Sequence, residues 1–389
     1  MPTRPSARAQ VPPFQVMTVL DEVERMRAAG RDVVSLCAGE PSGGAPAAVH
    51  ERAAALHGDR AALGYSPALG ITPLREAIAG HYRRWYGLEV AADDVAVTTG
   101  SSGAFVLAFL AAFSPGDRVG LTRPGYPAYR NTLAALGCEV VEIAVGPTTG
   151  FQPTPALLEA AGPLAGLVLA SPANPTGSMT SRAELTALAT WCAERGTLLV
   201  SDEIYHGLAY APEDAPGTCA WEIDRDNAVV VSSFSKYWGM TGWRLGWALL
   251  PPALRGSVDA LAGNLALCPP VPAQHAALAA FEERSYDEAQ QRLAALAAAR
   301  EVALDGARRL GWGPVAPADG AFYLYAGVPL GEHPDSVSWC RALLAQQGVA
   351  LVPGVDFDAV DGVAFVRLSF AAGADAVAEA FRRIEAFQG

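Results

Sequence analysis

Residues 228–244 read AVVVSSFSKYWGMTGWR, and this stretch decides the fold class. Val229, Val230 and Val231 form a continuous apolar run, which is typical of a strand buried on both faces of a parallel sheet. Small polar residues, a lysine and an arginine follow the run directly. Open α/β sheets bind their ligands at the carboxyl ends of their strands. The stretch therefore predicts a buried parallel strand followed by a ligand-binding loop.

The chain on either side repeats this pattern. Short β-branched runs alternate with longer Ala- and Leu-rich segments between residues 95 and 251, which favours a mostly parallel sheet with helices on both faces. Turn signals such as 114–117 (SPGD) and Gly137 separate them. We predict a doubly wound α/β core with strands at 95–99, 118–122, 139–145, 167–171, 198–202, 228–233 and 244–250, and helices at 104–113, 128–136 and 181–195.

The flanking segments predict a second, smaller domain. Residues 285–310 are charged and Ala-rich, without glycine or proline until Gly306, and indicate a long connecting helix. Beyond it, strands at 320–326, 349–352 and 363–370 and helices at 336–347 and 375–387 predict an α+β unit. A helix at 14–29 is expected to pack on that unit. The predicted divisions are an N-terminal arm (1–45), a large α/β domain (46–285) and a small C-terminal domain (286–389).

The amino-acid composition and net charge limit the kinds of partner that the protein is expected to bind. The chain has 389 residues, is 51% hydrophobic and 17% charged, and is predicted to fold as a globular protein. With 28 basic against 40 acidic residues and no basic run, we expect neither nucleic acid nor a membrane surface as a partner. The uncharged stretch 260–281 contains polar residues and three prolines, so we expect no membrane span. Six scattered cysteines and an N-terminus without an apolar signal segment predict a cytoplasmic protein.

Several familiar catalytic motifs are absent from the sequence. A Walker A loop needs glycine before lysine, whereas Lys236 follows Ser235. The sequence has no H-E-x-x-H, no G-x-S-x-G and no Cys/His cluster at zinc spacing. We therefore expect no metal, no ATP site of the Walker type and no Ser-His-Asp chemistry.

Lys236 is the only lysine in the sequence, so the other 27 of the 28 basic residues are arginines. A GC-rich genome would explain the preference for arginine over lysine on solvated surfaces, where the two residues are equivalent. The single remaining lysine is then a chance survivor. However, arginine can neither lose its proton nor form a Schiff base in a protein. Lys236 is therefore a candidate for amine chemistry.

The segment around Lys236 resembles the lysine region of the class I/II, fold type I aminotransferases, which depend on pyridoxal 5'-phosphate (PLP). Further family motifs occur in order, from Ala38-Gly39-Glu40-Pro41 to Val366-Arg367-Leu368-Ser369-Phe370. The resemblance implies that Lys236 holds PLP as an internal aldimine and later moves a proton between Cα and C4′. The implied reaction transfers the α-amino group of an L-amino acid to a 2-oxo acid through pyridoxamine phosphate.

Two further polar motifs follow predicted strands. Asp202 ends the strand at 198–202, where a carboxylate can pair with the pyridine nitrogen and keep it protonated. Its alternative role is a helix cap. The resemblance implies that Tyr205 and Asn174, the latter in the N-P-T-G motif 174–177, hydrogen-bond the ring oxygen O3′. A Pro-rich turn alone would also explain the second motif.

A cluster of small residues at 98–103 (TTGSSG) leads from a strand into an apolar helix. Backbone N–H groups at a helix N-terminus form an anion cradle, although such residues also serve as ordinary N-caps. The resemblance implies that the phosphate binds to Ser101, Ser102, Ser233, Ser235 and Arg244, that Tyr126 stacks on the ring, and that Tyr65 of a homodimeric partner reaches the phosphate.

Arg367 lies in an apolar strand and must find an anion there. The resemblance makes it the clamp for the substrate α-carboxylate, with a backbone contact from Gly39; a structural salt bridge is the alternative. The usual acidic and aromatic residues after Gly39-Glu40-Pro41 are replaced by residues 42–45 (SGGA), so the substrate entrance is expected to differ. The candidate pocket residues Phe14, Trp238 and Phe322 favour a neutral, hydrophobic amino acid.

Two other functions remain open from the sequence. A PLP enzyme of this fold can also act as a C–S β-lyase or a biosynthetic cyclase, because fold does not decide the reaction. A PLP-binding sensor without turnover is the second alternative. Such sensors carry an N-terminal helix-turn-helix domain, and the short segment before Val11 makes that arrangement unexpected.

Overall fold

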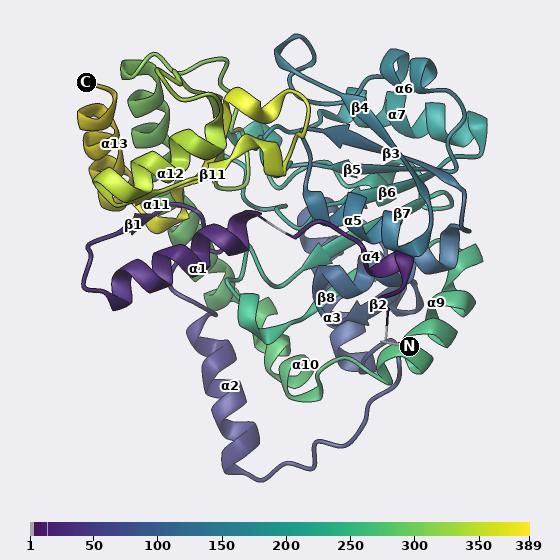
Figure 1. Cartoon of the computed structure of the whole chain (residues 1–389). Helices are drawn as coiled ribbons and strands as arrows, with labels where there is room; N and C mark the ends of the chain where they lie inside the picture. The colour runs from purple at the N-terminus through teal and green to yellow at the C-terminus, as the bar shows by residue number, and fades with distance from the viewer. Residues whose placement is uncertain (1–3, 14) are drawn as a thin grey trace.

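The computed structural model describes residues 4–13 and 15–389. Within them, a seven-stranded sheet has the order β2-β8-β7-β6-β5-β3-β4. Strand β8 runs antiparallel to β2 and β7, and the remaining pairs are parallel, which confirms the predicted mostly parallel sheet (Figure 1). The strands are β2 (Val95–Thr98), β3 (Arg118–Arg123), β4 (Glu139–Ala144), β5 (Gly166–Ala170), β6 (Leu198–Asp202), β7 (Ala228–Ser233) and β8 (Gly246–Leu249).

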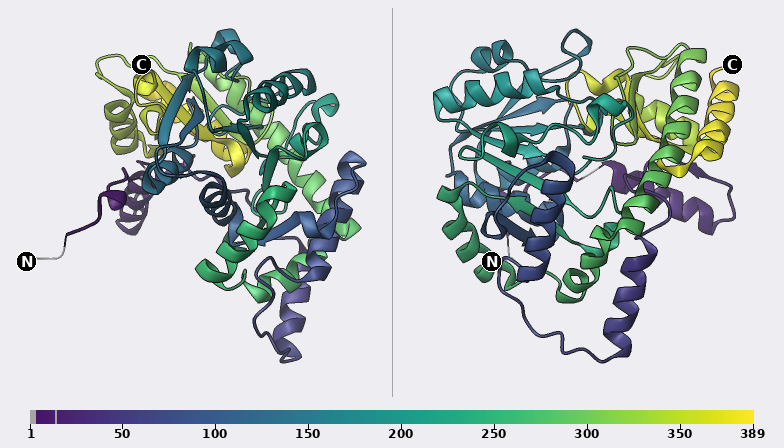
Figure 2. Two further views of the ribbon diagram at one scale, coloured as in Figure 1. Left: turned by 90° about the vertical axis from the view of Figure 1, so that its right-hand side faces the viewer. Right: turned by 180° about the vertical axis from the view of Figure 1, so that it is seen from behind.

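Helices cover both faces of this sheet, which explains why its central strands are apolar throughout (Figure 2). Along β7, Val229 and Val231 join one hydrophobic cluster and Val230 joins the other, because successive side chains point to opposite faces. Helices α4 (Gly100–Ala112), α5 (Pro127–Leu136) and α9 (Pro252–Ala266) cover the first face. The opposite face packs against α3 (Thr72–Tyr86), α6 (Pro155–Ala161), α7 (Arg182–Arg195) and α8 (Ala220–Ile223).

Local signals set the ends of these helices. Ser181 caps α7 by accepting the Glu184 N–H, while the Glu184 carboxylate accepts the Ser181 N–H in return. Helix α5 begins with Pro127 and ends at Gly137, whose φ of +89° suits a glycine C-cap. The predicted helices at 181–195 and 128–136 agree with these elements to within one residue.

The long helix α11 (Glu283–Arg309) occupies the predicted connecting segment, and the elements after it form a second group together with α1 and β1 from the N-terminal part of the chain. This group contains the antiparallel sheet β11-β12-β9 and the parallel pair β1-β10. Helix α1 (Gln15–Ala28) packs here, with Val23 and Met26 in the same cluster as Leu344 and Val352. The elements are β1 (Val34–Ser35), β9 (Tyr323–Gly327), α12 (Ser336–Gln347), β10 (Val349–Ala350), β11 (Val352–Pro353), β12 (Phe365–Ser369) and α13 (Ala374–Gln388). The domain boundaries given above stay a prediction.

Some predicted elements need correction. The expected strand at 349–352 is two short strands in different sheets, β10 and β11. The expected strand at 320–326 starts only at Tyr323, because Ala321 adopts a left-handed φ of +57° that no strand allows. Six α-helices of the described residues were not predicted: α2 (Ala47–Gly58), α10 (Val271–Ala277), and α3, α6, α8 and α9. Within residues 4–13 and 15–389, no helix combines the length and apolar character needed to cross a bilayer.

Candidate active site

A cavity of about 350 Å³ lies where β6 and β7 end. Its lining includes Asp202, the last residue of β6, together with Ser235 and Lys236, which follow β7. Of the predicted site residues, all except Ser233 and Tyr65 line this cavity: Gly39, Ser101, Ser102, Tyr126, Asn174, Asp202, Tyr205, Ser235, Lys236, Arg244 and Arg367. The fold thus brings together motifs that are more than 300 residues apart in the sequence.

The amine of Lys236 projects into the cavity and donates a hydrogen bond to the Gly39 carbonyl oxygen at 2.6 Å. Burial lowers its pKa from 10.5 to about 8, and the nearby Glu40 carboxylate partly opposes this shift. A substantial fraction of the amine is therefore neutral near physiological pH. This is the state required of a nucleophile or a proton acceptor.

Asp202 lies beneath the cavity at the end of a buried strand. Its Oδ1 accepts the Ile204 N–H at 3.2 Å, and its Oδ2 accepts the hydroxyl of Tyr129 from α5. Burial raises the pKa of Asp202 to about 6, although both donors favour the carboxylate. Tyr129 was not predicted; it lies in the first turn of α5, and its ring centroid is 5.3 Å from that of Tyr126, the residue that precedes the helix.

The hydroxyls of Tyr205 and Tyr323 lie 2.8 Å apart at the cavity wall. Tyr323 was not predicted as a site residue. A Cβ on Gly39 would lie 2.5 Å from the Tyr323 hydroxyl oxygen, so a larger residue at position 39 would require the Tyr323 side chain to shift. Asn174 uses Oδ1 to accept a hydrogen bond from Arg367 at 3.0 Å, and its amide nitrogen is the atom that can donate to a ligand.

The N-terminus of α4 and the side chain of Arg244 form an anion cradle. Gly100, at φ +67°, begins α4, and a Cβ there would lie 2.4 Å from Arg244 Nη2. Arg244 itself adopts a left-handed φ of +53° and donates only to the Thr241 carbonyl at 2.9 Å among the described contacts. This combination of helix N-terminus, guanidinium and hydroxyls fits a phosphate group.

Ser233 supports this cradle from below and does not line the cavity. Its hydroxyl donates to Ser235 Oγ at 2.8 Å, and its Oγ accepts the Ser235 N–H at 3.0 Å. Ser233 therefore orients Ser235, which does line the cavity.

Arg367, on β12, is a buried cation with only neutral partners in the described part of the chain. Its side chain is 4% exposed and donates to Asn174 Oδ1 at 3.0 Å and to the Cys37 carbonyl at 2.8 Å. Its guanidinium carbon lies 4.6 Å from the Tyr323 ring centroid and 4.8 Å from that of Phe357, and its Nε has no hydrogen-bond partner among the described residues. The expected alternative, a salt bridge, is not formed by any described carboxylate. A buried guanidinium without a counter-ion is costly, so the site favours binding of an anionic ligand.

The remaining wall of the cavity is largely apolar. It is lined by Val16, Met17 and Leu20 of α1, Phe105 and Val106 of α4, and Ala128, Thr132 and Ile204. Two of the predicted pocket residues are placed elsewhere. Trp238 is buried in an aromatic cluster and donates its indole N–H to the Ala280 carbonyl at 2.8 Å, and Phe322 is buried behind the cavity wall. The third, Phe14, lies outside the described residues.

Comparison with known proteins agrees with this geometry. The family of class I and II aminotransferases matches residues 31–384. Valine–pyruvate aminotransferase of Mycobacterium tuberculosis is 55% identical over 388 residues, covering 99% of this chain and 98% of that protein. Aspartate/prephenate aminotransferase of Thermus thermophilus is 35% identical and covers 95% of each chain.

Solved structures extend the likeness to three dimensions. The crystal structure of an aminotransferase from Mycobacterium tuberculosis matches with a TM-score of 0.95 and 52% identity over 99% of both chains. Thermus thermophilus aspartate aminotransferase with maleate matches with a TM-score of 0.92 and 32% identity, covering 98% of this chain and 99% of that one. These matches confirm the predicted fold class and do not favour the lyase or cyclase alternative. The protein therefore belongs to the class I and II aminotransferases.

Proposed function

We propose that the protein binds PLP in this cavity and transfers the α-amino group of a neutral aliphatic L-amino acid, such as valine, to a 2-oxo acid such as pyruvate. The observation that carries the proposal is the pair of arginines, Arg244 and Arg367, on one cavity. Neither forms an ion pair with a described carboxylate, and both border the cavity that contains Lys236. Two guanidinium cations on the same cavity as an amine match a cofactor phosphate and a substrate carboxylate.

PLP, when bound, supplies an aldehyde that can take up an amino group and a pyridinium ring that can accept the electrons released at Cα. The cradle residues Ser101, Ser102, Ser235 and Arg244 would bind its phosphate. Asp202 would hold a proton on the pyridine nitrogen, and Tyr205 and Asn174 would donate to O3′. These side chains fix the ring before any substrate arrives.

Lys236 and Arg367 would act on the substrate. Arg367 would bind the α-carboxylate and so orient the Cα–H bond, with Gly39 lining the same end of the cavity. The Lys236 amine, with its pKa lowered to about 8, can accept the proton from Cα and later return it.

The apolar wall supports the choice of substrate. Val16, Met17 and Leu20 present aliphatic side chains to the cavity, and the lining contains no cation other than Lys236, Arg244 and Arg367 among the described residues. A second carboxylate on the substrate would therefore have no partner of its own, and an aliphatic side chain would be buried. The 55% identical relative is named for valine and pyruvate, which agrees with this wall.

We also propose a homodimer with shared sites. Tyr65 lies between α2 and α3, is 85% exposed and does not line the cavity of its own chain. The resemblance noted above would place its hydroxyl at the phosphate of a second copy. Sedimentation should give twice the mass of one chain, and Tyr65→Phe should raise the Kd for PLP. A monomer that binds PLP normally would contradict this part of the proposal. The cytoplasmic location stays a prediction.

The substrate assignment is tested by following alanine formation from pyruvate with each of a panel of L-amino acids. Valine should give the highest kcat/KM and aspartate a value lower by a factor of about 100 or more. Ammonia should not appear when the 2-oxo acid is omitted. Preference for aspartate would contradict the substrate class, and ammonia release from a cysteine-type substrate would support a lyase instead.

A further inference from the structure

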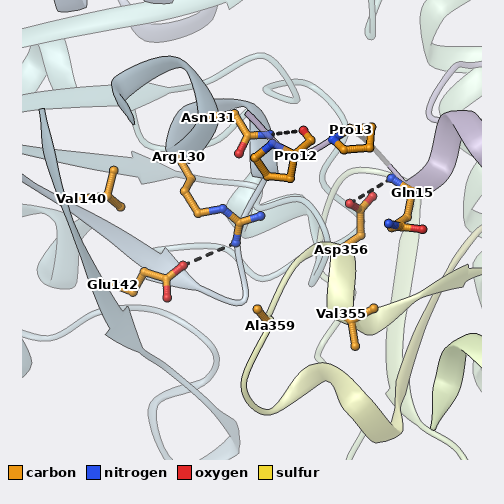
Figure 3. Close-up of a pocket in the computed structure, with 10 residues that line it drawn as sticks. All are labelled: Pro12, Pro13, Gln15, Arg130, Asn131, Val140, Glu142, Val355, Asp356 and Ala359. Atoms are coloured by element: carbon orange, nitrogen blue, oxygen red, sulfur yellow. Dashed lines mark hydrogen bonds and ion pairs between the residues drawn. The ribbon is translucent and has the colours of Figure 1, made fainter. Parts of the chain in front are cut away.

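The loop 354–362, which we call the latch loop, connects β11 to β12 and touches three parts of the site. Figure 3 shows its residues Val355, Asp356 and Ala359 bordering a second pocket of about 630 Å³. The opposite wall of that pocket belongs to α5 and β4, the flank of the seven-stranded sheet. At this second pocket, which is separate from the active-site cavity, the latch loop therefore faces the flank of the seven-stranded sheet from the side of the three-stranded sheet.

Its first contact is with Arg367. The ring of Phe357, which is 3% exposed, lies with its centroid 4.8 Å from the guanidinium carbon of Arg367. An aromatic face near a desolvated guanidinium stabilises the cation and restricts its position. Since the hydrogen-bond partners of Arg367 within residues 4–13 and 15–389 are neutral, the two rings beside it, Phe357 and Tyr323, define much of its surroundings.

Its second contact is with the end of β3, which leads to Tyr126. The Gly125 N–H donates to the Phe357 carbonyl at 3.1 Å. Arg123 Nη1 donates to Asp358 Oδ1 at 3.0 Å, and these two side chains are only 14% and 4% exposed. Arg123 Nη1 also lies 3.2 Å from Asp361 Oδ2, an exposed carboxylate of the same loop. The Arg123–Asp358 contact is itself largely shielded from solvent, so salt screens it less than a surface ion pair.

Its third contact is with α1. The Asp356 carboxylate accepts the N–H groups of Gln15 at 3.2 Å and Val16 at 3.4 Å, at the start of the helix. Figure 3 shows Asp356 directed at Gln15. Because Val16 also lines the active-site cavity, the latch loop contacts the apolar wall as well as the cation.

We propose that Phe357, Asp358 and Arg123 are positioning residues for the substrate carboxylate. Arg367 belongs to the three-stranded sheet, whereas Lys236 and Asp202 follow or end strands of the seven-stranded sheet. Arg367 can orient Cα toward Lys236 only if the two sheets keep a fixed relation, and the latch loop joins Arg367 to the segment before Tyr126. The proposal rests on the proposed role of Arg367 as the carboxylate clamp.

The test compares four variants of the PLP-loaded enzyme. Phe357→Leu keeps an apolar side chain without the aromatic face, and the double variant Arg123→Gln/Asp358→Asn replaces the ion pair by two amides. Arg123→Lys is the conservative variant. Arg182→Gln is the control, because it breaks the ion pair with Glu222 (2.6 Å), which joins α7 to α8 outside the latch loop and its partners. Each variant is measured for KM and kcat with valine and pyruvate, for the Kd of the unreactive 3-methylbutanoate by calorimetry, and for its thermal midpoint.

Phe357→Leu and the double variant should raise both KM values and the Kd of 3-methylbutanoate about tenfold, with kcat within about twofold. Arg123→Lys should retain most of the affinity, and Arg182→Gln all of it. Unchanged KM and Kd values in Phe357→Leu overturn the proposal, even where the thermal midpoint falls. If the double variant does not fold, the KM and Kd values of Phe357→Leu decide whether the proposal holds. A fifth variant, Arg367→Lys, tests the proposed role of Arg367 separately from that of the latch loop. Unchanged KM values in Arg367→Lys would refute the role of Arg367 as the carboxylate clamp.

Discussion

The hydroxyl of Tyr129 on α5 donates a hydrogen bond to the Asp202 carboxylate at the end of β6, and both side chains are buried. Hydrogen bonds to a charged group in such surroundings contribute about 1.5–3 kcal/mol. The contact therefore favours the ionised form of Asp202, which burial alone would disfavour.

Tyr129→Phe tests this relationship through pH dependence. Without the hydroxyl, the pKa of Asp202 should rise further above its value of about 6, so a higher pH is needed to ionise it. The acid limb of the kcat/KM profile should move to higher pH by about one unit. The control is Tyr210→Phe, which removes a half-buried hydroxyl that donates to the Ala321 carbonyl away from the cavity. An unshifted profile in Tyr129→Phe would refute the role of Tyr129.

Gly100→Ala tests the anion cradle. The new Cβ would lie 2.4 Å from Arg244 Nη2 at a φ of +67°, so the guanidinium must leave the helix N-terminus. The Kd for PLP should rise by about tenfold or more, since a charge-assisted contact is lost. Gly103→Ala is the control on the same helix, because its Cβ would meet only Thr99 and Thr98 atoms at 3.6 and 3.7 Å. Equal PLP affinity in both variants would argue against the cradle.

Chemical labelling of the apoprotein tests the state of Lys236. Burial lowers its pKa to about 8, and only the neutral amine attacks an acylating reagent. Labelling at Lys236, located by peptide mapping, should therefore reach half of its maximum rate near pH 8. As the sequence has no other lysine, only the N-terminal amine competes, and Lys236→Ala identifies that signal. A midpoint near 10 would contradict the lowered pKa.

Leu20→Ala tests the apolar wall. Its side chain lines the cavity from α1, so truncation should remove contacts that favour a branched aliphatic substrate. The ratio of kcat/KM for valine over 2-aminobutyrate should fall by about tenfold, the usual effect of a lost methylene-scale contact. Leu265→Ala, which truncates an exposed leucine on α9, should leave the ratio unchanged. If the ratio of kcat/KM values is unchanged in Leu20→Ala, the side chain of Leu20 does not select for branched substrates.

The sequence predicted most of the large sheet, because buried strands there are short apolar runs that end in polar residues. Strand 228–233 and strand 198–202 agree with β7 and β6 at both ends. It predicted neither the antiparallel direction of β8 nor the split between β10 and β11. Strand direction depends on tertiary pairing, and a two-residue strand carries too few residues for a periodic pattern.

The sequence predicted those cavity residues that are charged, such as Lys236 and Arg367, or that belong to a turn motif after a strand. Tyr129 and Tyr323 were missed, because a tyrosine in a helix or strand has the same pattern as an ordinary core residue. The role of α1 in lining the cavity was missed for the same reason, since Val16 fits a packing face equally well. Trp238 was wrongly placed in the pocket because aromatic content alone does not indicate which side of a loop is buried.

The most direct test of the account is the visible absorption spectrum of the purified protein with PLP, recorded before and after addition of L-valine alone. After removal of unbound PLP, the wild type should show a visible band that Lys236→Ala lacks. In the wild type the band should be lost with valine, should return with pyruvate and should leave one equivalent of alanine. A band that valine does not change, or one that persists in Lys236→Ala, would contradict the central claim that Lys236 and the two arginines hold the cofactor and the amino acid in this cavity.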